Sequence, residues 1–431
     1  MKSEYSDILT GLPNLILFHN MIDDLIAQNS EMDRFAIACL SIENLREINE
    51  TFGYQIGDEA IKYVADYLDN SYFTARIAKE KFAILISDIK SSNYLMETLQ
   101  TIIRNIRFPS LNNEESIYIS MNAGLAVYPD HGNKVTDLVH NAENALYMAK
   151  EKGDEIQFYS EEYREEIINQ VHLTNLLQKG LDNDEFTLYF QPEVDLKTNK
   201  IIGVEALIRW FLPGKGFISP EKFIPIAEKS NLIYDIELMV FEKALRQKVQ
   251  WEKEGFKHLE LSINLSCKTL ESECNFRKLE KILASYKVNC SKIIIEITET
   301  VNLHAIKPIE QRLNRLKKLG IKIALDDFGT GFSSLSYLRE LPIDIIKIDK
   351  SFIRAISDNK KEAIIIKNII TMAHELGYRV VAEGIETHEQ YKFLRENCCD
   401  RGQGFLLCMP LPVGNLSTLL KVNKYKKVIA V

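Results

Sequence analysis

Eight short apolar segments recur through the second half of the chain, and this recurrence constrains the fold more than any other feature. The segments begin near Thr187, Ile201, Leu259, Lys292, Ile321, Ile343, Arg379 and Arg401. Most of the gaps between them are long enough for a helix, as expected where parallel strands alternate with crossover helices. Because eight such units occupy roughly 250 residues in known barrels, the pattern predicts a (β/α)8, TIM-like barrel of the α/β class.

The faces of these segments indicate where chemistry would occur. On a strand, residues i, i+2 and i+4 share one face. Nearly every segment brings a charged or amide side chain to one face near its C-terminal end: Gln191, Glu205, Arg209, Asn264, Glu296, Asp326, Lys347, Asp349 and Glu383. In a barrel those ends meet at one mouth, where barrel enzymes hold their active sites. For any single residue, a solvated charge on a loop is an equally good interpretation; the repetition favours a common site.

Several carboxylates at one mouth would repel one another. Hard divalent cations such as Mg²⁺ or Mn²⁺ relieve that repulsion, because they take oxygen ligands. Asp326 and Asp327 are adjacent, so a regular strand would point them to opposite faces. We expect both to reach one metal site only if Asp327 lies past the last pleat, where Gly329 and Gly331 give the backbone freedom to turn.

The first half of the chain has a mixed α+β pattern. The predicted strands cover residues 35–42, 74–77, 82–86 and 117–128, with the second and third forming a hairpin, and the predicted helices cover 14–26 and 138–150. A helix rich in Glu and Ile around residues 160–181 then leads into the second half. These patterns predict two domains, at 1–159 and 160–431.

Composition excludes several classes of protein. With 46% hydrophobic and 26% charged residues, the chain is globular and not disordered. A net charge of −8, without a basic block before the lysine-rich end, argues against nucleic-acid or anionic-membrane binding by bulk charge. No apolar run approaches the roughly 18 residues of a membrane span. The seven cysteines form no Cys-x-x-Cys pair, so reduced thiols and a cytoplasmic location are expected.

The second half contains a series of short motifs: Phe190-Gln191-Pro192, Glu205-Ala206-Leu207, Phe223-Ile224-Pro225, Asn264-Leu265-Ser266, Glu296-Ile297-Thr298-Glu299, Asp326-Asp327-Phe328-Gly329, Lys347-Ile348-Asp349, Glu383-Gly384-Ile385-Glu386 and Gln403-Gly404. Taken together, these motifs resemble those of EAL-domain cyclic di-GMP phosphodiesterases. They stand in the order expected of the family. This resemblance implies an enzyme in which two Mg²⁺ or Mn²⁺ ions per active site open cyclic di-GMP to linear 5′-pGpG.

The resemblance also implies a role for each matching residue. The implied metal ligands are Glu205, Asn264, Glu296, Asp326 and Asp327, and the implied catalytic residues are Lys347, Glu383 and Glu205. The implied substrate-binding residues are Gln191, Leu207, Arg209, Asp349, Glu386 and Gln403. Glu299 would anchor the loop Asp327–Ser336, which links metal binding to dimer contacts in this family. A homodimer is therefore expected.

The first half contains Leu9-Thr10-Gly11-Leu12-Pro13-Asn14, Gly57-Asp58 and Ala145-Leu146-Tyr147-Met148-Ala149-Lys150. Through these motifs it resembles a GGDEF diguanylate cyclase domain, but with a degenerate signature. Ala78, Lys79, Glu80 and Lys81 stand where Gly-Gly-Asp/Glu-Glu is expected, and Ser41 stands where the family has a metal-binding Asp. The resemblance therefore implies a domain that makes no cyclic di-GMP and serves regulation or dimerisation. Weak GTP binding stays open, because Asn49, Asp58 and Glu80 keep residue types found in the family.

Two other functions fit the same sequence. One is a receptor that binds cyclic di-GMP without hydrolysing it and signals through a protein partner, and the other is an interaction scaffold. Receptors of this kind usually lose several metal ligands, and a scaffold would leave the carboxylates idle. The complete ligand set in this sequence favours the enzyme.

Overall fold

The computed structural model describes residues 5–28, 34–87, 89, 91–109, 116–298, 306–329, 338, 340–356 and 360–423. The chain forms two compact units, residues 1–171 and 172–431. The division falls inside helix α6 (Glu161–Asp182). The predicted boundary after residue 159 lies just before this helix begins, and it stays a prediction.

The first unit is a five-stranded sheet in the order β2-β3-β1-β6-β7 with helices packed against it. The strands are β1 (Phe35–Ile42), β2 (Phe73–Arg76), β3 (Lys81–Ile86), β6 (Met121–Tyr128) and β7 (Ile156–Phe158). The helices are α1 (Leu15–Gln28), α2 (Leu45–Phe52), α3 (Tyr54–Asp69), α4 (Ser92–Asn105) and α5 (Val135–Lys152). Every residue of β1 is buried, which fits a sequence in which only Ser41 is polar.

Two sequence predictions for this unit can be compared with the structure directly. The hairpin is confirmed, because β2 and β3 pair antiparallel. The single strand predicted for residues 117–128 is wrong, because this segment forms two strands, β5 (Ser116–Tyr118) and β6. β5 pairs with the short β4 (Arg107–Pro109) and not with the main sheet. The side chain of Asn44 binds the backbone between the two strands, donating to the carbonyl of Tyr118 and accepting from the amide of Ser120.

The second unit is a closed barrel of eight strands, and it confirms the predicted fold. The strands are β8 (Phe186–Asp195), β9 (Lys200–Leu212), β11 (Glu260–Asn264), β12 (Ile293–Thr298), β13 (Lys322–Phe328), β14 (Ile345–Ile348), β15 (Arg379–Ala382) and β16 (Arg401–Gly402). Pairing between β8 and β9 closes the ring. The short strands β10 (Gly216–Ile218) and β17 (Leu411–Pro412) extend it.

One strand runs against the predicted direction. β8 is antiparallel to both of its barrel neighbours, β9 and β16, whereas the other neighbouring pairs of the ring are parallel. Only residues 196–199 connect β8 to β9, which is too short for the crossover helix that a parallel pair needs. The first two strands therefore form a hairpin.

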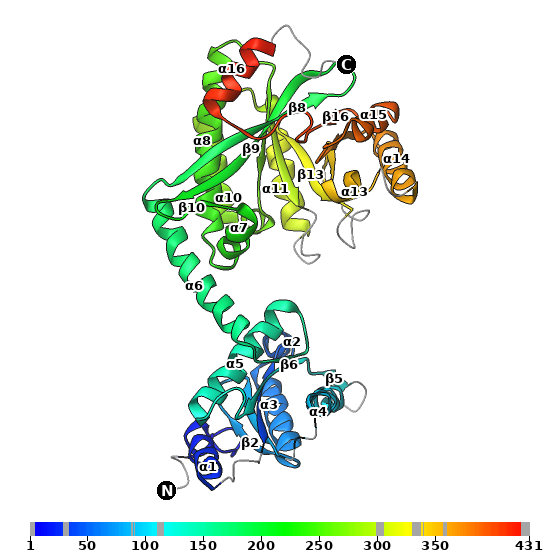
Figure 1. Ribbon diagram of the computed structural model, residues 1–431. Helices are drawn as coiled ribbons and strands as arrows, with labels where there is room; N and C mark the ends of the chain where they lie inside the picture. The colour runs from blue at the N-terminus through cyan, green and yellow to red at the C-terminus, as the bar shows by residue number, and fades with distance from the viewer. Residues whose placement is uncertain are drawn as a thin grey trace. The chain divides into compact units, whose positions relative to one another are not determined.

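Helices cover the outside of the barrel (Figure 1). They are α7 (Pro220–Lys229), α8 (Ile233–Lys253), α9 (Cys267–Glu271), α10 (Glu273–Ser285), α11 (Ile306–Lys318), α13 (Lys350–Arg354), α14 (Lys360–Glu375), α15 (His388–Glu396) and α16 (Val413–Asn423), with a 3-10 turn η1 (Cys290–Lys292) before β12. Their apolar faces and the outward side chains of the strands form one large core, which includes the fully buried Trp251 and Phe276.

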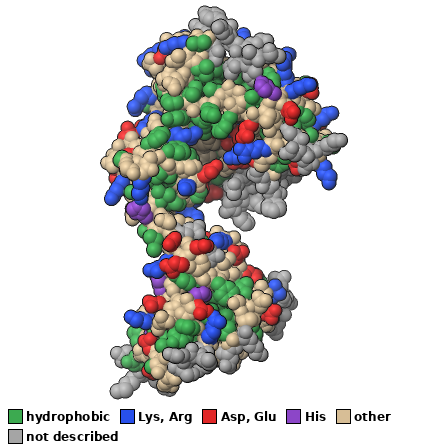
Figure 2. All heavy atoms as spheres, viewed as in Figure 1, with side chains coloured by type: hydrophobic (Ala, Val, Ile, Leu, Met, Phe, Trp, Pro, Cys, Tyr) green, Lys and Arg blue, Asp and Glu red, His purple; other side chains and the backbone are tan. Residues whose placement is uncertain are grey.

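Charged side chains of both signs lie on the surface of the molecule (Figure 2). Acidic and basic side chains are interspersed on the face of the molecule that Figure 2 shows, without a broad region of one sign. Among the described residues, no helix is both long and apolar enough to cross a bilayer.

Candidate active site

The inside of the barrel is arranged in levels along each strand, as the two-residue period requires. A small apolar cluster of Ile294, Ala324, Ile345 and Val381 fills the middle level. Two residues further along each of these strands stand Glu296, Asp326, Lys347 and Glu383. The polar side chains therefore lie at the C-terminal mouth, above an apolar layer that closes the barrel beneath them.

Lys347 is the centre of the mouth. Its side chain is buried, and its ammonium nitrogen Nζ lies 2.6 Å from Glu383 Oε1, 2.7 Å from Glu296 Oε2, 3.2 Å from Asp326 Oδ1 and 3.6 Å from Glu205 Oε2. One ammonium group thus contacts four carboxylates contributed by β9, β12, β13 and the residue after β15.

Two amide side chains orient these carboxylates. Glu205 accepts a hydrogen bond of 2.9 Å from Asn264 Nδ2 and one of 2.8 Å from Gln403 Nε2. Gln403 Nε2 also donates to Glu383 Oε1 over 3.0 Å. The opposite atom of this amide, Gln403 Oε1, is buried and has no hydrogen-bond partner among the described residues. It is a free acceptor at the edge of the acidic cluster.

Asp326 and Asp327 reach the same site through an irregular backbone. Asp327 has a left-handed φ of 54°, and the pairing of β13 with β14 shifts between Leu325 and Phe328. Asp327 therefore lies within β13, and the expectation from the sequence that it lies past the end of the strand is wrong. The shift in pairing breaks the regular alternation, so two adjacent residues can face one site. One oxygen from each of Asp326, Asp327 and Glu383 lies within 4.8 Å of the others.

Four carboxyl groups of the mouth resist ionisation. Burial raises the pKa of Asp326 above its ordinary value against the opposing effect of Lys347. Burial raises the pKa of Glu296 well above its ordinary value despite the nearby Lys347, and the charges of Glu205 and Asp326 add to the shift. Burial raises the pKa of Glu383 to about 8 against the opposing effect of Lys347. Burial and the charge of Asp326 raise the pKa of Asp327 to about 6.

Glu205 and Lys347 show the complementary effect. Burial alone would raise the pKa of Glu205, but Lys347 and the two amide donors outweigh it and place the pKa below its ordinary value. Burial alone would lower the pKa of Lys347, but the surrounding carboxylates raise it well above its ordinary value. The mouth therefore holds four carboxyl groups around a single ammonium group, and they cannot all be ionised and neutralised by it.

The donor set fits divalent cations that prefer oxygen. Carboxylate oxygens dominate it, and Asn264 gives its Nδ2 to Glu205, which leaves its Oδ1 as the remaining acceptor of that amide. Mg²⁺ and Mn²⁺ take ligands of these types. No sulfur or imidazole group belongs to the cluster formed by Asp326, Asp327 and Glu383.

Three of the predicted substrate-binding residues lie on the hairpin of β8 and β9. Gln191 is buried opposite Glu205, and its Nε2 donates to the carbonyl of Cys408 over 3.1 Å. Leu207 and Arg209 line a cavity of about 230 Å³ that also contacts Asn264. The guanidinium carbon of Arg209 lies 5.6 Å from the ring centroid of Tyr189, so cation–π contact holds it beside the cavity.

The remaining predicted residues make local contacts. Asp349 caps α13 by accepting from the amide of Ser351, and Glu386 pairs with Arg354 at 2.8 Å. Their predicted roles in substrate binding stay predictions. Glu299 and most of the loop Asp327–Ser336 lie outside the described residues, so the anchor also stays a prediction.

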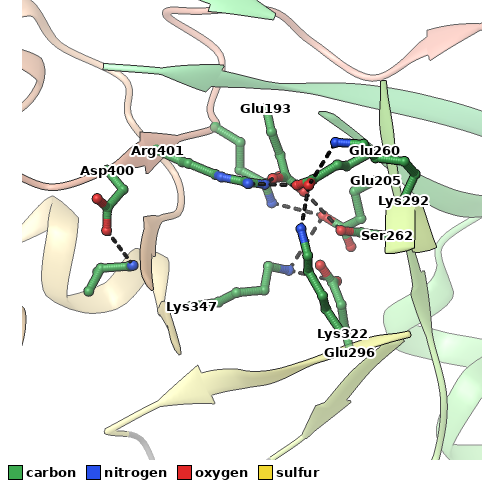
Figure 3. A network of polar contacts seen from close by, with 12 residues as sticks. Glu193, Glu205, Glu260, Ser262, Lys292, Glu296, Lys322, Lys347, Asp400 and Arg401 are labelled. Atoms are coloured by element: carbon green, nitrogen blue, oxygen red, sulfur yellow. Dashed lines mark hydrogen bonds and ion pairs between the residues drawn. The ribbon is translucent and has the colours of Figure 1, made fainter. Parts of the chain in front are cut away.

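The sequence interpretation missed a second polar network at the other end of the barrel (Figure 3). Arg401 contacts Glu193 at 3.1 Å and Glu260 at 2.6 Å, and Lys322 contacts Glu260 at 2.5 Å. Arg401 lowers the pKa of Glu260 to about 2 against the effect of burial. Strand parity could have identified this network, because Glu260 and Lys322 share faces with Asn264 and Asp326.

The first unit has its own polar cavity, of about 440 Å³, lined in part by Glu43, Asn49, Lys79, Glu80 and Lys150. At its edge, the hydroxyl of Ser41 accepts from Lys150 Nζ over 2.9 Å, and the same ammonium pairs with Glu43 at 2.6 Å. Lys81 pairs with Glu143 at 2.9 Å. Lysine ammonium groups therefore pair with Glu43, beside Ser41, and with Glu143.

Comparisons with known proteins agree with this geometry. Residues 174–410, more than half of the chain, match the family description "EAL domain", and residues 4–155 match "Diguanylate cyclase, GGDEF domain". The chain therefore belongs to the EAL family and carries a GGDEF domain ahead of the EAL domain.

Two curated relatives and two solved structures illustrate the similarity. The chain is 30% identical to the cyclic di-GMP phosphodiesterase PdeR of Escherichia coli over 94% of its own length and 62% of the relative's. It is also 30% identical to the cyclic di-GMP phosphodiesterase NbdA of Pseudomonas aeruginosa, over 97% of the chain and 54% of the relative. The chain thus spans little more than half the length of these relatives.

Both solved structures cover a little more than half of the chain. A structure described as "PaMucR Phosphodiesterase, c-di-GMP complex" is 35% identical, with a TM-score of 0.55, covering 57% of this chain and 99% of that one. An EAL domain protein from Listeria monocytogenes is also 35% identical, with a TM-score of 0.52, covering 57% of this chain and 96% of that one.

Proposed function

We propose that the barrel unit is a metal-dependent phosphodiesterase that hydrolyses cyclic di-GMP to linear 5′-pGpG. The observation that carries the proposal is the buried Lys347, which contacts four carboxylates at the barrel mouth. Relatives named as cyclic di-GMP phosphodiesterases, and a similar structure described as a complex with c-di-GMP, support this choice of substrate.

In this proposal, Glu205, Asn264, Glu296, Asp326 and Asp327 hold two divalent cations, which we propose to be Mg²⁺ or Mn²⁺. When bound, such ions lower the pKa of water and stabilise the oxygens of an in-line displacement at phosphorus. They also neutralise negative charge at the mouth, so that a dianionic substrate can approach.

The chain's own residues have separate tasks in the reaction. Lys347 places a fixed positive charge beside the attacking water and the phosphate, where negative charge develops in the transition state. Glu383, which contacts Lys347 at 2.6 Å, is assigned to accept the proton of that water. Gln403 orients Glu205 and Glu383 by donating to both.

Substrate binding is assigned to the residues that border the metal ligands. Leu207 and Arg209 line the cavity beside Asn264, where a guanine base could be held between an apolar side chain and a guanidinium group. Gln191, Asp349, Glu386 and Gln403 complete the proposed set around the mouth.

The GGDEF unit is proposed to be inactive as a cyclase. Ser41 has a hydroxyl group where a metal site would need a carboxylate, and this hydroxyl already accepts a hydrogen bond from Lys150. We propose that this unit regulates the barrel and supports a homodimer, and that its polar cavity could still admit GTP weakly. A cytoplasmic location stays a prediction.

The proposal is tested with the purified full chain and cyclic di-GMP. Hydrolysis to 5′-pGpG, followed by chromatography, is expected with Mg²⁺ or Mn²⁺ and not after a chelator has removed the metal. Tight binding of cyclic di-GMP without hydrolysis under both conditions would contradict the proposal and favour the receptor.

A further inference from the structure

A second cavity, of about 580 Å³, lies at the opposite end of the barrel from the candidate active site. It is lined by the start of β15 and β16, the end of the antiparallel β8, and residues of α14 and α15; its lining includes Lys197, His374, Arg379, Arg395, Asp400 and Arg401. None of the residues assigned to the active site lines this cavity.

Three of the cations that line this cavity have no anionic partner among the residues that the structure describes. Lys197, Arg379 and Arg395 are exposed, and none of their side chains makes a hydrogen bond or ion pair with another residue in the described part of the chain. Three unpaired cations around one hollow are unexpected in a chain with a net charge of −8. Concave walls also focus the field of such charges toward an approaching anion.

The two carboxylates of the cavity are already engaged. Asp195 accepts from the amide and hydroxyl of Thr198, at 2.6 and 2.8 Å. Asp400 accepts from the amide of Val380 over 2.8 Å and lies 2.9 Å from His374 Nε2. One oxygen of each carboxylate is therefore engaged by local polar groups.

The back of the cavity is fixed by the barrel floor. Arg401 is buried, and its guanidinium is held by Glu193 and Glu260 (Figure 3). Cys399 is also buried beside it. A rigid wall with exposed cations at its rim is pre-organised, so a ligand would order few groups on binding.

We propose that this cavity binds a small molecule that carries at least two phosphate groups. Arginine guanidinium groups form paired hydrogen bonds with phosphate oxygens, and two arginines with one lysine can contact two phosphates. The volume lies within the range of small-molecule pockets, about 300–1,000 Å³. A neutral ligand would leave the three cations uncompensated.

The test must separate this cavity from two other places where phosphate could bind. Divalent cations at the barrel mouth could hold phosphate, so the full chain is stripped of metal before the measurement. The cavity of the GGDEF unit also contains cations, including Arg46 and Lys79. A variant with Arg46→Ala and Lys79→Ala therefore serves as the matched control.

The experiment is titration calorimetry of the metal-free full chain with inorganic pyrophosphate. One site per chain is expected, with affinity at least tenfold weaker in the Arg379→Gln/Arg395→Gln variant and unchanged in the Arg46→Ala/Lys79→Ala variant. Circular dichroism confirms that both variants are folded; if the arginine variant is not, Lys197→Gln, on the hairpin turn, gives the same comparison. Absence of binding, equal binding by the arginine or lysine variant, or equal binding of citrate would overturn the proposal.

Discussion

Nζ of Lys347 lies 2.7 Å from Oε2 of Glu296, and both side chains are almost wholly shielded from solvent, with 1% exposed. The pKa of the lysine is raised by its carboxylate neighbours despite burial, and the pKa of the glutamate is raised by burial despite the lysine. This pair is therefore not an isolated ion pair, because three further carboxyl groups contact the same ammonium group. A cluster with more carboxyl groups than cations is suited to binding metal cations.

The first prediction concerns Lys347→Ala. Because the ammonium group acts mainly where charge develops in the transition state, we expect kcat to fall by about 10²–10³-fold while KM changes little. Steady-state hydrolysis of cyclic di-GMP, with binding measured separately, gives the two parameters. The control is Lys367→Ala, an exposed lysine of α14. If affinity weakened tenfold while turnover of bound substrate persisted, Lys347 would be a phosphate clamp instead.

The second prediction concerns Glu205→Gln. This change removes a buried negative charge but keeps an oxygen that can accept from Asn264 or Gln403. We expect turnover to fall by roughly three orders of magnitude, since one proposed ligand of the cations is lost. The matched control is Glu271→Gln on the exposed surface of α9, which should hydrolyse cyclic di-GMP at the wild-type rate. Undiminished turnover by Glu205→Gln would show that Glu205 does not belong to the active site.

The third prediction concerns Glu260 and acid stability. Its pKa in the folded protein is about 2, below the ordinary value of 4.5, because of Arg401 and Lys322. The ionised group therefore stabilises the fold above about pH 4.5, and this contribution is lost as the pH falls toward 2. We expect Glu260→Gln to lower the free energy of unfolding by about 3 kcal/mol at pH 7, as for other broken buried ion pairs.

Urea unfolding at several pH values between 7 and 3 measures this effect. The difference between Glu260→Gln and wild type should shrink below pH 4.5. Glu273 is a matched control, because arginines also lower its pKa to about 2 but its carboxylate is exposed to solvent. We expect Glu273→Gln to lower the free energy of unfolding far less than Glu260→Gln does. A constant difference at all pH values would show that Glu260 acts through packing alone.

Strand parity explains why so much of the barrel site could be predicted. The two-residue period assigns a face to every strand residue, so Glu205, Asn264, Glu296 and Lys347 could be grouped before any contact was known. The direction of β8 was missed because alternation of apolar segments does not report strand direction. The short connection at residues 196–199 contained the missing information.

Other features depend on the folded chain. The turn of Asp327 toward Asp326 needs a left-handed backbone that its sequence does not require. The cationic cavity joins Lys197, Arg379 and Arg395, which are separated by up to 198 residues and meet only because the barrel closes. No local pattern marks such a site.

The fourth prediction concerns assembly. The family resemblance implies a homodimer in which the loop Asp327–Ser336 couples the dimer contact to metal affinity. Light scattering of the full chain is expected to give the mass of two chains at micromolar concentration. Calorimetry with Mg²⁺ on diluted samples should show weaker affinity where the dimer dissociates. A fully active monomer at high concentration would contradict the prediction.

The fifth prediction concerns the GGDEF unit and GTP. Ser41 cannot replace a carboxylate as a ligand of equal strength, and Lys81, which pairs with Glu143, stands where the family resemblance expects Glu. Ala78 and Lys79 add Cβ atoms at a turn where glycines would let the backbone approach a triphosphate. We therefore expect no cyclic di-GMP from GTP and Mg²⁺.

The assay uses the Glu205→Gln variant, so that any cyclic di-GMP would accumulate and not be degraded. Even Ser41→Asp in that background should stay inactive, because the restored carboxylate would pair with Lys150 and the turn would still lack its glycines. Cyclic di-GMP from the Glu205→Gln variant would overturn the assignment of an inactive cyclase. Calorimetry with GTP separates the two remaining roles: millimolar binding would support a GTP-sensing unit, and absence of binding would leave only packing and dimerisation.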